Sequence, residues 1–153
     1  MSRIEYIAQA LTEKKQTITC AESCTGGLLA AALTSIPGSS AFFERSFVTY
    51  SNQAKKQLLN VTEETLRHYG AVSEETVREM ALGALIAAKS DYALAFRASP
   101  ARTAARRKNP WAWLGSVLPP NSGFGRSITN FPAAAKKSAA KPYNMLWRLS
   151  NII

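Results

Sequence analysis

The chain has 153 residues, about the length of one domain with a single sizeable core. No apolar run approaches the roughly 18 residues of a membrane-spanning helix, and residues 1–17 lack the features of a signal peptide, so we expect a soluble cytoplasmic protein without a membrane partner. Cys20 and Cys24 are too few for a disulfide framework or a four-ligand zinc site, so we expect reduced thiols, and the pair is only a weak signal for a metal.

The net charge of +9 is distributed very unevenly along the chain. Residues 1–95 hold nine Lys and Arg against ten Asp and Glu, whereas residues 96–153 hold ten Lys and Arg and no acid. All three Trp and six of the seven Pro also lie in the second part. We call the boundary between Ala95 and Phe96 the seam, because the sequence changes character there.

Before the seam, helical and extended patterns alternate. Apolar residues recur at helical spacing in the helical segments, and Ser51, Thr62 and Ser73 each precede such a segment as typical N-caps. The predicted elements are, in chain order, a helix at 3–13, a strand at 17–21, a helix at 28–35, a strand at 46–50, helices at 52–59, after Thr62 and at 74–89, and a strand that begins at Tyr92. Strands that alternate with helices indicate an α/β domain, a layered sheet with flanking helices.

A polar, glycine-containing loop follows the first predicted strand. Its sequence is Glu22-Ser23-Cys24-Thr25-Gly26-Gly27. The Ser23 hydroxyl lies beside backbone N–H groups that open a helix, an arrangement that can bind an anion or stabilise an oxyanion. The glycines let a ligand approach the backbone closely. Taken alone, however, a strand–Gly-Gly–helix turn is more often plain packing geometry.

Lys55 is the second candidate for chemistry, one turn into the helix that follows Ser51. An isolated lysine at such a position is more often a solvated surface charge. If Lys55 is instead buried beside Ser23, desolvation lowers the pKa of its amine, and the neutral amine can take the serine's proton. Ser–Lys pairs are an established variant of nucleophilic catalysis.

Two segments carry a specific resemblance. The strings AESCTGGLLAAALTSIPGSSAFFERSFVTYSNQAKKQLLNV and HYGAVSEETVREMALGAL closely resemble the CinA C-terminal domain family, and the resemblance covers residues 4–95. It implies that family's layered α/β fold and its activity, the deamidation of nicotinamide mononucleotide in pyridine nucleotide salvage. The products would be nicotinate mononucleotide and ammonia. One local departure is Ser46, where the family pattern ERGFVTYSN has glycine.

The resemblance also implies roles for single residues. Ser23 would be the nucleophile and Lys55 its general base, with Tyr50 supporting proton transfer. The remaining candidates would bind the substrate or hold the loop: Glu22, Thr25, Gly26, Gly27, Thr49 and Asn52. The reaction would need no metal or cofactor, and the intact family implies a homo-oligomer. Cys24, next to Ser23, is an alternative thiol nucleophile that the family pattern does not favour.

The resemblance stops at the seam, where the family continues with a glycine-rich segment of the form GIAGP-x-GG and a KPVG strand. The genetic code connects the two. If each true codon starts one base upstream, its last two bases are the first two of the codon observed. Applied to residues 96–112, this rule permits VSGIAGPDGGSEEKPVG, the missing family motif. Our hypothesis is that one base was lost near the codons of Ala95 and Phe96, in the gene or in its reading.

This hypothesis makes residues 1–95 an incomplete family domain and residues 96–153 a basic, out-of-frame tail. Such a tail has not been selected to bury a core, so we expect poor order over residues 97–140, an open sheet edge and reduced or absent activity. Two rival interpretations remain. Residues 1–95 could be an interaction fragment that pairs with an intact copy, or the basic, Trp-containing tail could bind nucleic acid, which we consider remote.

Overall fold

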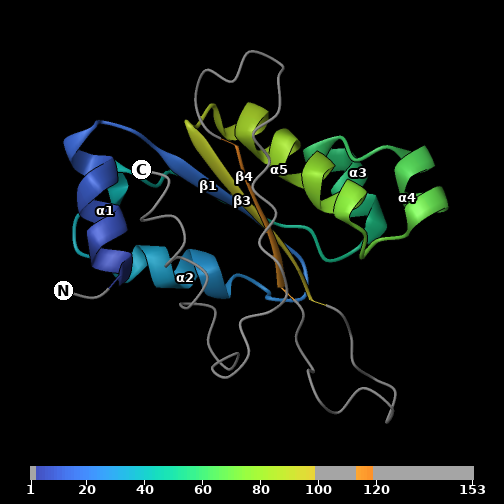
Figure 1. Cartoon of the computed structure of the whole chain (residues 1–153), viewed down its shortest axis with the longest axis horizontal. Helices are drawn as coiled ribbons and strands as arrows, with labels where there is room; N and C mark the ends of the chain where they lie inside the picture. The colour runs from blue at the N-terminus through green and yellow to red at the C-terminus, as the bar shows by residue number, and fades with distance from the viewer. Residues whose placement is uncertain (1–2, 99–112, 119–153) are drawn as a thin grey trace, which may run out of the picture.

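The computed structural model describes residues 3–98 and 113–118, and in these ranges helices and strands alternate (Figure 1). The elements are α1 (Arg3–Glu13), β1 (Ile18–Glu22), α2 (Leu28–Thr34), the short 3-10 helix η1 (Ser39–Ala41), β2 (Ser46–Val48), α3 (Asn52–Leu59), α4 (Glu63–Tyr69), α5 (Glu74–Ala88), β3 (Tyr92–Ala98) and β4 (Trp113–Leu118). The predicted helices and strands before the seam are confirmed, with small differences at their ends. No helix among the described residues is long and apolar enough to cross a membrane.

The four described strands form one sheet in the order β2-β1-β3-β4. β1 is parallel to both of its neighbours, so Cys20 lies opposite Ser46 on one side and Leu94 on the other. The carboxyl ends of β1 and β2 therefore meet at the same edge of the sheet. Ligand sites of open α/β sheets lie at this edge, and here it brings the loop after Glu22 beside the segment after Val48.

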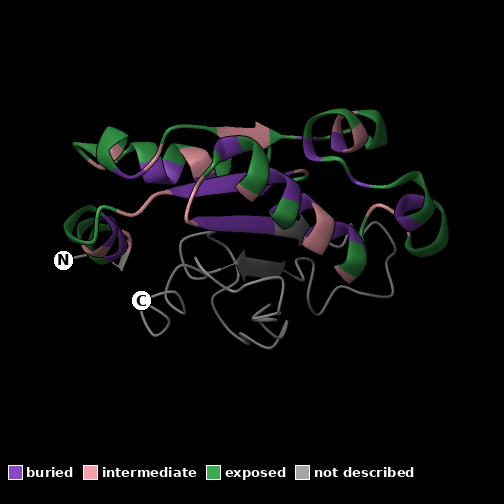
Figure 2. Ribbon diagram, turned by 90° about the horizontal axis from the view of Figure 1, so that it is seen from above, coloured by how far each residue is buried: buried purple, intermediate pink, exposed green. Residues whose placement is uncertain are grey.

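Each face of the sheet carries its own core, and Figure 2 shows strands in the middle of the sheet coloured as buried. The alternation of side chains along β1 decides which residue faces which core. Cys20 packs with apolar residues of α1 and α2, while Ala21 packs with apolar residues of α3, α4 and α5. The predicted fold, a layered α/β sheet with flanking helices, is confirmed. One layer holds α1 and α2, and the other holds the helix that carries Lys55.

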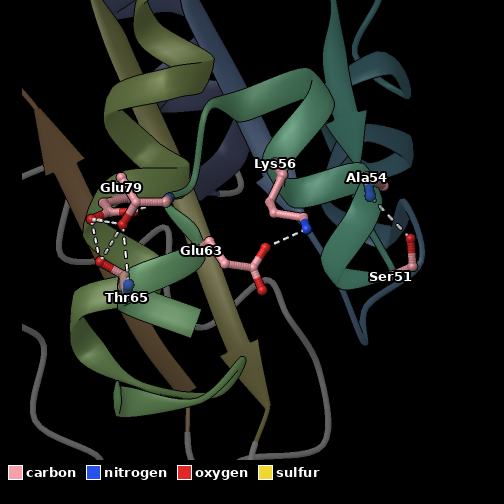
Figure 3. A network of polar contacts seen from close by, with 7 residues as sticks. Ser51, Ala54, Lys56, Glu63, Thr65 and Glu79 are labelled. Carbon is pink, nitrogen blue, oxygen red and sulfur yellow. Dashed lines mark hydrogen bonds and ion pairs between the residues drawn. The ribbon is translucent and has the colours of Figure 1, made fainter. Parts of the chain in front are cut away.

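Side-chain caps start the helices of the second layer. The hydroxyl of Ser51 accepts the Ala54 N–H at 3.0 Å, as predicted for the N-cap of α3. Thr62 and Ser73 cap α4 and α5 in the same way. Figure 3 shows Glu79 of α5 reaching α4, where its carboxylate accepts the Thr65 hydroxyl at 2.5 Å. An ion pair between Lys56 and Glu63 adds a link from α3 to α4.

α3 and α5 touch at the backbone. Gly83 of α5 is buried, and a Cβ added there would lie 1.9 Å from the carbonyl oxygen of Leu59 and 2.6 Å from its carbonyl carbon. Only a residue without a side chain allows this approach. The contact fixes the end of α3 one turn after Lys55, so it bears on where the lysine amine lies.

β4 is a strand that the sequence did not predict. It lies beyond the seam and pairs antiparallel with β3, with Ala95 opposite Ser116. The side of β3 that was expected to form an open sheet edge is therefore paired over these residues. Poor order was predicted for residues 97–140, a range that includes this strand and the end of β3. The rest of that prediction lies outside the described residues.

Candidate active site

The loop that carries Ser23 is a tight turn between β1 and α2. The Gly26 N–H donates to the Ser23 carbonyl at 3.0 Å, and the Leu28 N–H donates to the Thr25 carbonyl at 3.1 Å. Gly26 and Gly27 have φ values of 58° and 101°, in the left-handed region that residues with a side chain rarely adopt. The two glycines are therefore needed for the turn itself, and Ser23 is left half-buried at its start.

Glu22 closes this turn from within the protein. Its side chain is fully buried, and its carboxylate accepts N–H groups of Gly27 at 3.2 Å, Leu29 at 3.1 Å and Ala30 at 2.9 Å. A carboxylate at a helix start also suits the positive pole of the helix dipole. The anion-binding interpretation of the turn therefore does not hold for these three N–H groups, because the chain's own carboxylate occupies them.

Lys55 lies beside Ser23, as the Ser–Lys interpretation requires. Only 1% of Lys55 is exposed. Its Nζ lies 3.1 Å from the Ser23 Oγ, 2.8 Å from the Thr49 carbonyl oxygen and 3.3 Å from the Tyr50 carbonyl oxygen. The alternative that Lys55 is a solvated surface charge is therefore wrong.

The Lys55 amine has three oxygen neighbours. As an ammonium group it donates one hydrogen bond to each of them, to the carbonyls of Thr49 and Tyr50 and to the Ser23 hydroxyl. As a neutral amine it keeps two N–H groups for the carbonyls, and its lone pair can accept the Ser23 hydroxyl. Burial lowers the pKa of the Lys55 amine from its ordinary value of 10.5, while the nearby Cys24 acts more weakly in the opposite direction. Burial thus shifts the balance toward the neutral form of Lys55, which can accept a proton.

Thr25 presents an unused polar atom in the same loop. Thr25 is 8% exposed, and its hydroxyl oxygen is buried without a hydrogen-bond partner among the described residues. Buried hydroxyls nearly always have a partner in native proteins, because an unsatisfied one is costly. Two residues from Ser23, this hydroxyl could bind a ligand atom.

The other predicted residues occupy distinct positions. Thr49 is fully buried, and its hydroxyl lies 3.4 Å from the Glu22 carbonyl oxygen, so it joins β2 to β1. Tyr50 is 75% exposed, and its described contact with Lys55 is made by its carbonyl oxygen. Asn52 is exposed at the first position of α3. The role of the Tyr50 hydroxyl in proton transfer therefore stays a prediction.

Neither described cysteine is in a disulfide. Cys20 is buried in β1, and burial raises the pKa of its thiol well above 9.0, which keeps it protonated. Cys24 is exposed, one residue after Ser23. The Ser23 hydroxyl oxygen lies 3.1 Å from the buried lysine amine.

The sequence does not mark the carbonyls of Thr49 and Tyr50 as hydrogen-bond acceptors of Lys55. Every residue has a carbonyl, so no residue type marks this role. The pattern Thr49-Tyr50-Ser51 before a capped helix gives one indirect signal. It places the end of a strand one helical turn before Lys55.

The family of the chain follows from its sequence. The model of the family described as the CinA C-terminal domain matches residues 2–110. The chain belongs to this family. The prediction made from the motifs is thus confirmed, and the match extends beyond the seam.

Some curated relatives of this CinA-domain chain carry an enzyme name. The nicotinamide-nucleotide amidohydrolase PncC of Escherichia coli (strain K12) is 58% identical over 94 residues, which are 61% of this chain and 57% of the relative. The protein of the same name from Enterobacter agglomerans is 54% identical over 111 residues, 71% of this chain and 68% of the relative. The chain therefore spans little more than half of the E. coli relative.

Solved structures of the family share the fold. The competence/damage inducible protein CihA of Agrobacterium tumefaciens superposes with a TM-score of 0.74 at 35% identity, over 85% of this chain and 77% of that one. The competence damage-inducible protein A of Klebsiella pneumoniae gives a TM-score of 0.73 at 28% identity, over 98% of this chain and 89% of that one.

Proposed function

We propose that the chain is a nicotinamide-nucleotide amidohydrolase. It would convert nicotinamide mononucleotide to nicotinate mononucleotide and ammonia. The observation that carries this proposal is the buried Lys55 amine, 3.1 Å from the Ser23 hydroxyl oxygen. The names of the two PncC relatives supply the substrate. A serine with a desolvated amine beside it is suited to acyl transfer from an amide.

The first half-reaction forms an ester on Ser23. The Ser23 oxygen attacks the carboxamide carbon while the hydroxyl proton passes to the neutral Lys55 amine. The tetrahedral intermediate then breaks its C–N bond, and the Lys55 ammonium returns the proton to the departing nitrogen, which leaves as ammonia. The predicted part of Tyr50 is to assist this transfer. These proton transfers need no metal or cofactor, because Lys55 carries the proton from the Ser23 oxygen to the departing nitrogen.

The second half-reaction releases the acid. A water molecule gives a proton to Lys55 and attacks the ester carbon. When the C–O bond to Ser23 breaks, the serine oxygen takes the proton back from Lys55 and nicotinate mononucleotide leaves. Lys55 ends each half-reaction neutral, so the lowered pKa of its amine favours the resting form in both.

Three residues are our candidates for direct substrate contacts. Thr25 has a buried hydroxyl without a described partner. A Cβ at Gly26 would meet no atom within 4 Å, so the backbone there faces open space that a ligand can enter. Asn52 offers an exposed amide at the start of α3. The predicted contacts from Glu22, Gly27 and Thr49 would be indirect, because the described polar groups of these residues bind within the protein.

We also propose that the frame changes at the seam and that this chain is a disabled or weakened member of its family. The support is the codon rule, which restores VSGIAGPDGGSEEKPVG over residues 96–112. Loss of the glycine-rich segment would remove part of the site for the nucleotide, so substrate affinity should fall while the Ser23–Lys55 pair remains.

Ammonia release from nicotinamide mononucleotide tests the proposed function. The 153-residue chain should be measured beside a frame-restored version, with Ser23→Ala and Lys55→Met variants of each. We expect serine- and lysine-dependent release from the restored version, and much less from the chain as it stands. Full activity in the present chain would refute the proposed weakening. Release that survives Ser23→Ala in both versions would refute the Ser–Lys mechanism.

A further inference from the structure

Glu22 connects the two halves of the Ser23–Lys55 pair through contacts that the reaction itself does not use. The first connection is its side chain. Both carboxylate oxygens are engaged: one accepts the Ala30 N–H at 2.9 Å, and the other accepts the N–H groups of Gly27 and Leu29 at 3.2 and 3.1 Å. These bonds tie the strand residue directly before Ser23 to the helix that follows the Ser23 loop.

The second connection is the main chain of Glu22. Its carbonyl oxygen accepts the Thr49 N–H at 2.8 Å. The carbonyl of Thr49 in turn accepts the Lys55 amine at 2.8 Å. Glu22 therefore holds the Ser23 loop with its side chain, and its main chain holds Thr49, whose carbonyl accepts the Lys55 amine.

The loop needs such an anchor because its backbone is intrinsically mobile. Gly26 and Gly27 have access to more backbone conformations than other residues, so the loop loses more entropy when it is ordered. A buried carboxylate with three N–H donors opposes this loss, since hydrogen bonds to a charged group are the strong ones. A short helix such as α2 supplies little rigidity of its own.

We infer that Glu22 is a positioning residue, which holds Ser23 against Lys55 and does not bind the substrate. This inference rests on the proposed Ser–Lys function. The fully buried carboxylate has both oxygens occupied, so it has no surface to offer a ligand. The three N–H groups that it occupies are equally closed to a substrate anion. Negative charge that develops on the substrate oxygen during the reaction must be stabilised by groups other than these three N–H groups.

The test compares Glu22→Gln with Glu75→Gln in the 153-residue chain. The control makes the same chemical change at an exposed carboxylate on α5. The probe is phenylmethanesulfonyl fluoride, which reacts with an activated serine and contains no nucleotide. Sulfonylation of Ser23 is followed by mass spectrometry from pH 6 to about pH 10, a range that includes lowered lysine pKa values. Hydrogen exchange at the Gly27, Leu29 and Ala30 amides is measured on the same proteins.

We expect slow exchange at these three amides in the unmodified chain and in Glu75→Gln, and faster exchange in Glu22→Gln. Ser23 sulfonylation should fall on the order of tenfold or more in Glu22→Gln, because a displacement near 1 Å is enough to disable a catalytic pair. Lys55→Met should also slow sulfonylation, yet add little to the effect of Glu22→Gln, since both changes break one pair. A purely structural role would leave the two effects additive.

Fast exchange with unchanged Ser23 sulfonylation in Glu22→Gln would overturn the inference. If Glu22→Gln does not fold, Glu22→Asp takes its place, because it keeps the charge but is too short to reach all three amides. Full Ser23 reactivity in that variant would likewise overturn it. The unmodified chain tests the proposed function separately. If that function is wrong, Ser23 would be sulfonylated no faster than the exposed Ser51, and the positioning role of Glu22 would be wrong as well.

Discussion

The Nζ of Lys55 lies 3.1 Å from the Oγ of Ser23, although 32 positions separate the two residues in the sequence. The parallel pairing of β1 with β2 accounts for this contact. It places the two strand ends side by side, so that the loop after β1 faces the start of α3. The cap at Ser51 then begins a helix whose first turn carries the lysine inward.

Burial of Lys55 should make the stability of the domain depend on pH. The pKa of its amine is lowered in the folded chain, so below 10.5 the unfolded chain binds more proton than the folded one. The free energy of unfolding should therefore rise with pH across the window between the folded pKa and 10.5, and level off above it. Urea unfolding at several pH values measures this. In Lys55→Met the free energy of unfolding should not rise over this pH range. A rise that persists in this variant would mean that other groups cause it.

Thr25→Val should separate binding from stability. Valine has the shape of threonine without the hydroxyl, and the Thr25 hydroxyl has no described partner. We predict that the variant is as stable as the parent or about 1 kcal/mol more stable, because an unsatisfied buried group is removed. KM for nicotinamide mononucleotide should rise in the frame-restored version, because the substrate loses a hydrogen bond.

Thr19→Val is the matched control for Thr25→Val. Thr19 is also buried, but its hydroxyl donates to the Arg45 carbonyl at 2.9 Å. Loss of this donor should destabilise the fold by about 1–2 kcal/mol and leave KM unchanged. A Thr25→Val variant that loses stability as Thr19→Val does would mean that the Thr25 hydroxyl has a partner within the fold.

Gly83→Ala should destabilise the domain although alanine favours helix. The new Cβ would meet the Leu59 backbone 1.9 Å away, so α3 and α5 must separate. We predict a net loss of roughly 1–3 kcal/mol in the free energy of unfolding, and a fall in kcat because α3 carries Lys55. Chemical unfolding and ammonia release by the frame-restored version measure both.

Ala87→Gly is the control for helix propensity, since Ala87 is exposed on the same helix. It should lower stability by about 0.5–1 kcal/mol without changing kcat. Equal or greater stability in Gly83→Ala would show that the two helices accommodate the methyl group, and it would contradict the close backbone contact.

The elements before the seam could be predicted because local patterns determine them. Ser51, Thr62 and Ser73 carry the cap signal in their own side chains, and the structure places each of them at a helix start. The Ser–Lys pair could be proposed because the motif supplies both residues. Their contact required the order of the strands, which no single segment encodes.

The roles of Glu22 and Gly83 could not be predicted because they depend on contacts between distant or folded segments. The sequence left two roles open for Glu22, to hold the loop or to bind the substrate, and only the folded turn shows that the carboxylate faces the N–H groups of α2. Gly83 resembles an ordinary helix position until α3 is packed against it. β4 was missed because the sequence after the seam has no clear periodicity.

Titration of the Lys55 side chain shows whether this lysine can act as the base for Ser23. Selective ¹⁵N labelling of lysine, with NMR spectra recorded from neutral pH to about pH 11, follows the amine without requiring catalysis, and Lys55→Met identifies its signal. We predict that the pKa of the Lys55 amine lies below 10.5 and shifts when Ser23 is replaced by Ala. A Lys55 that titrates at the ordinary lysine value and does not respond to Ser23→Ala would contradict its assignment as the base.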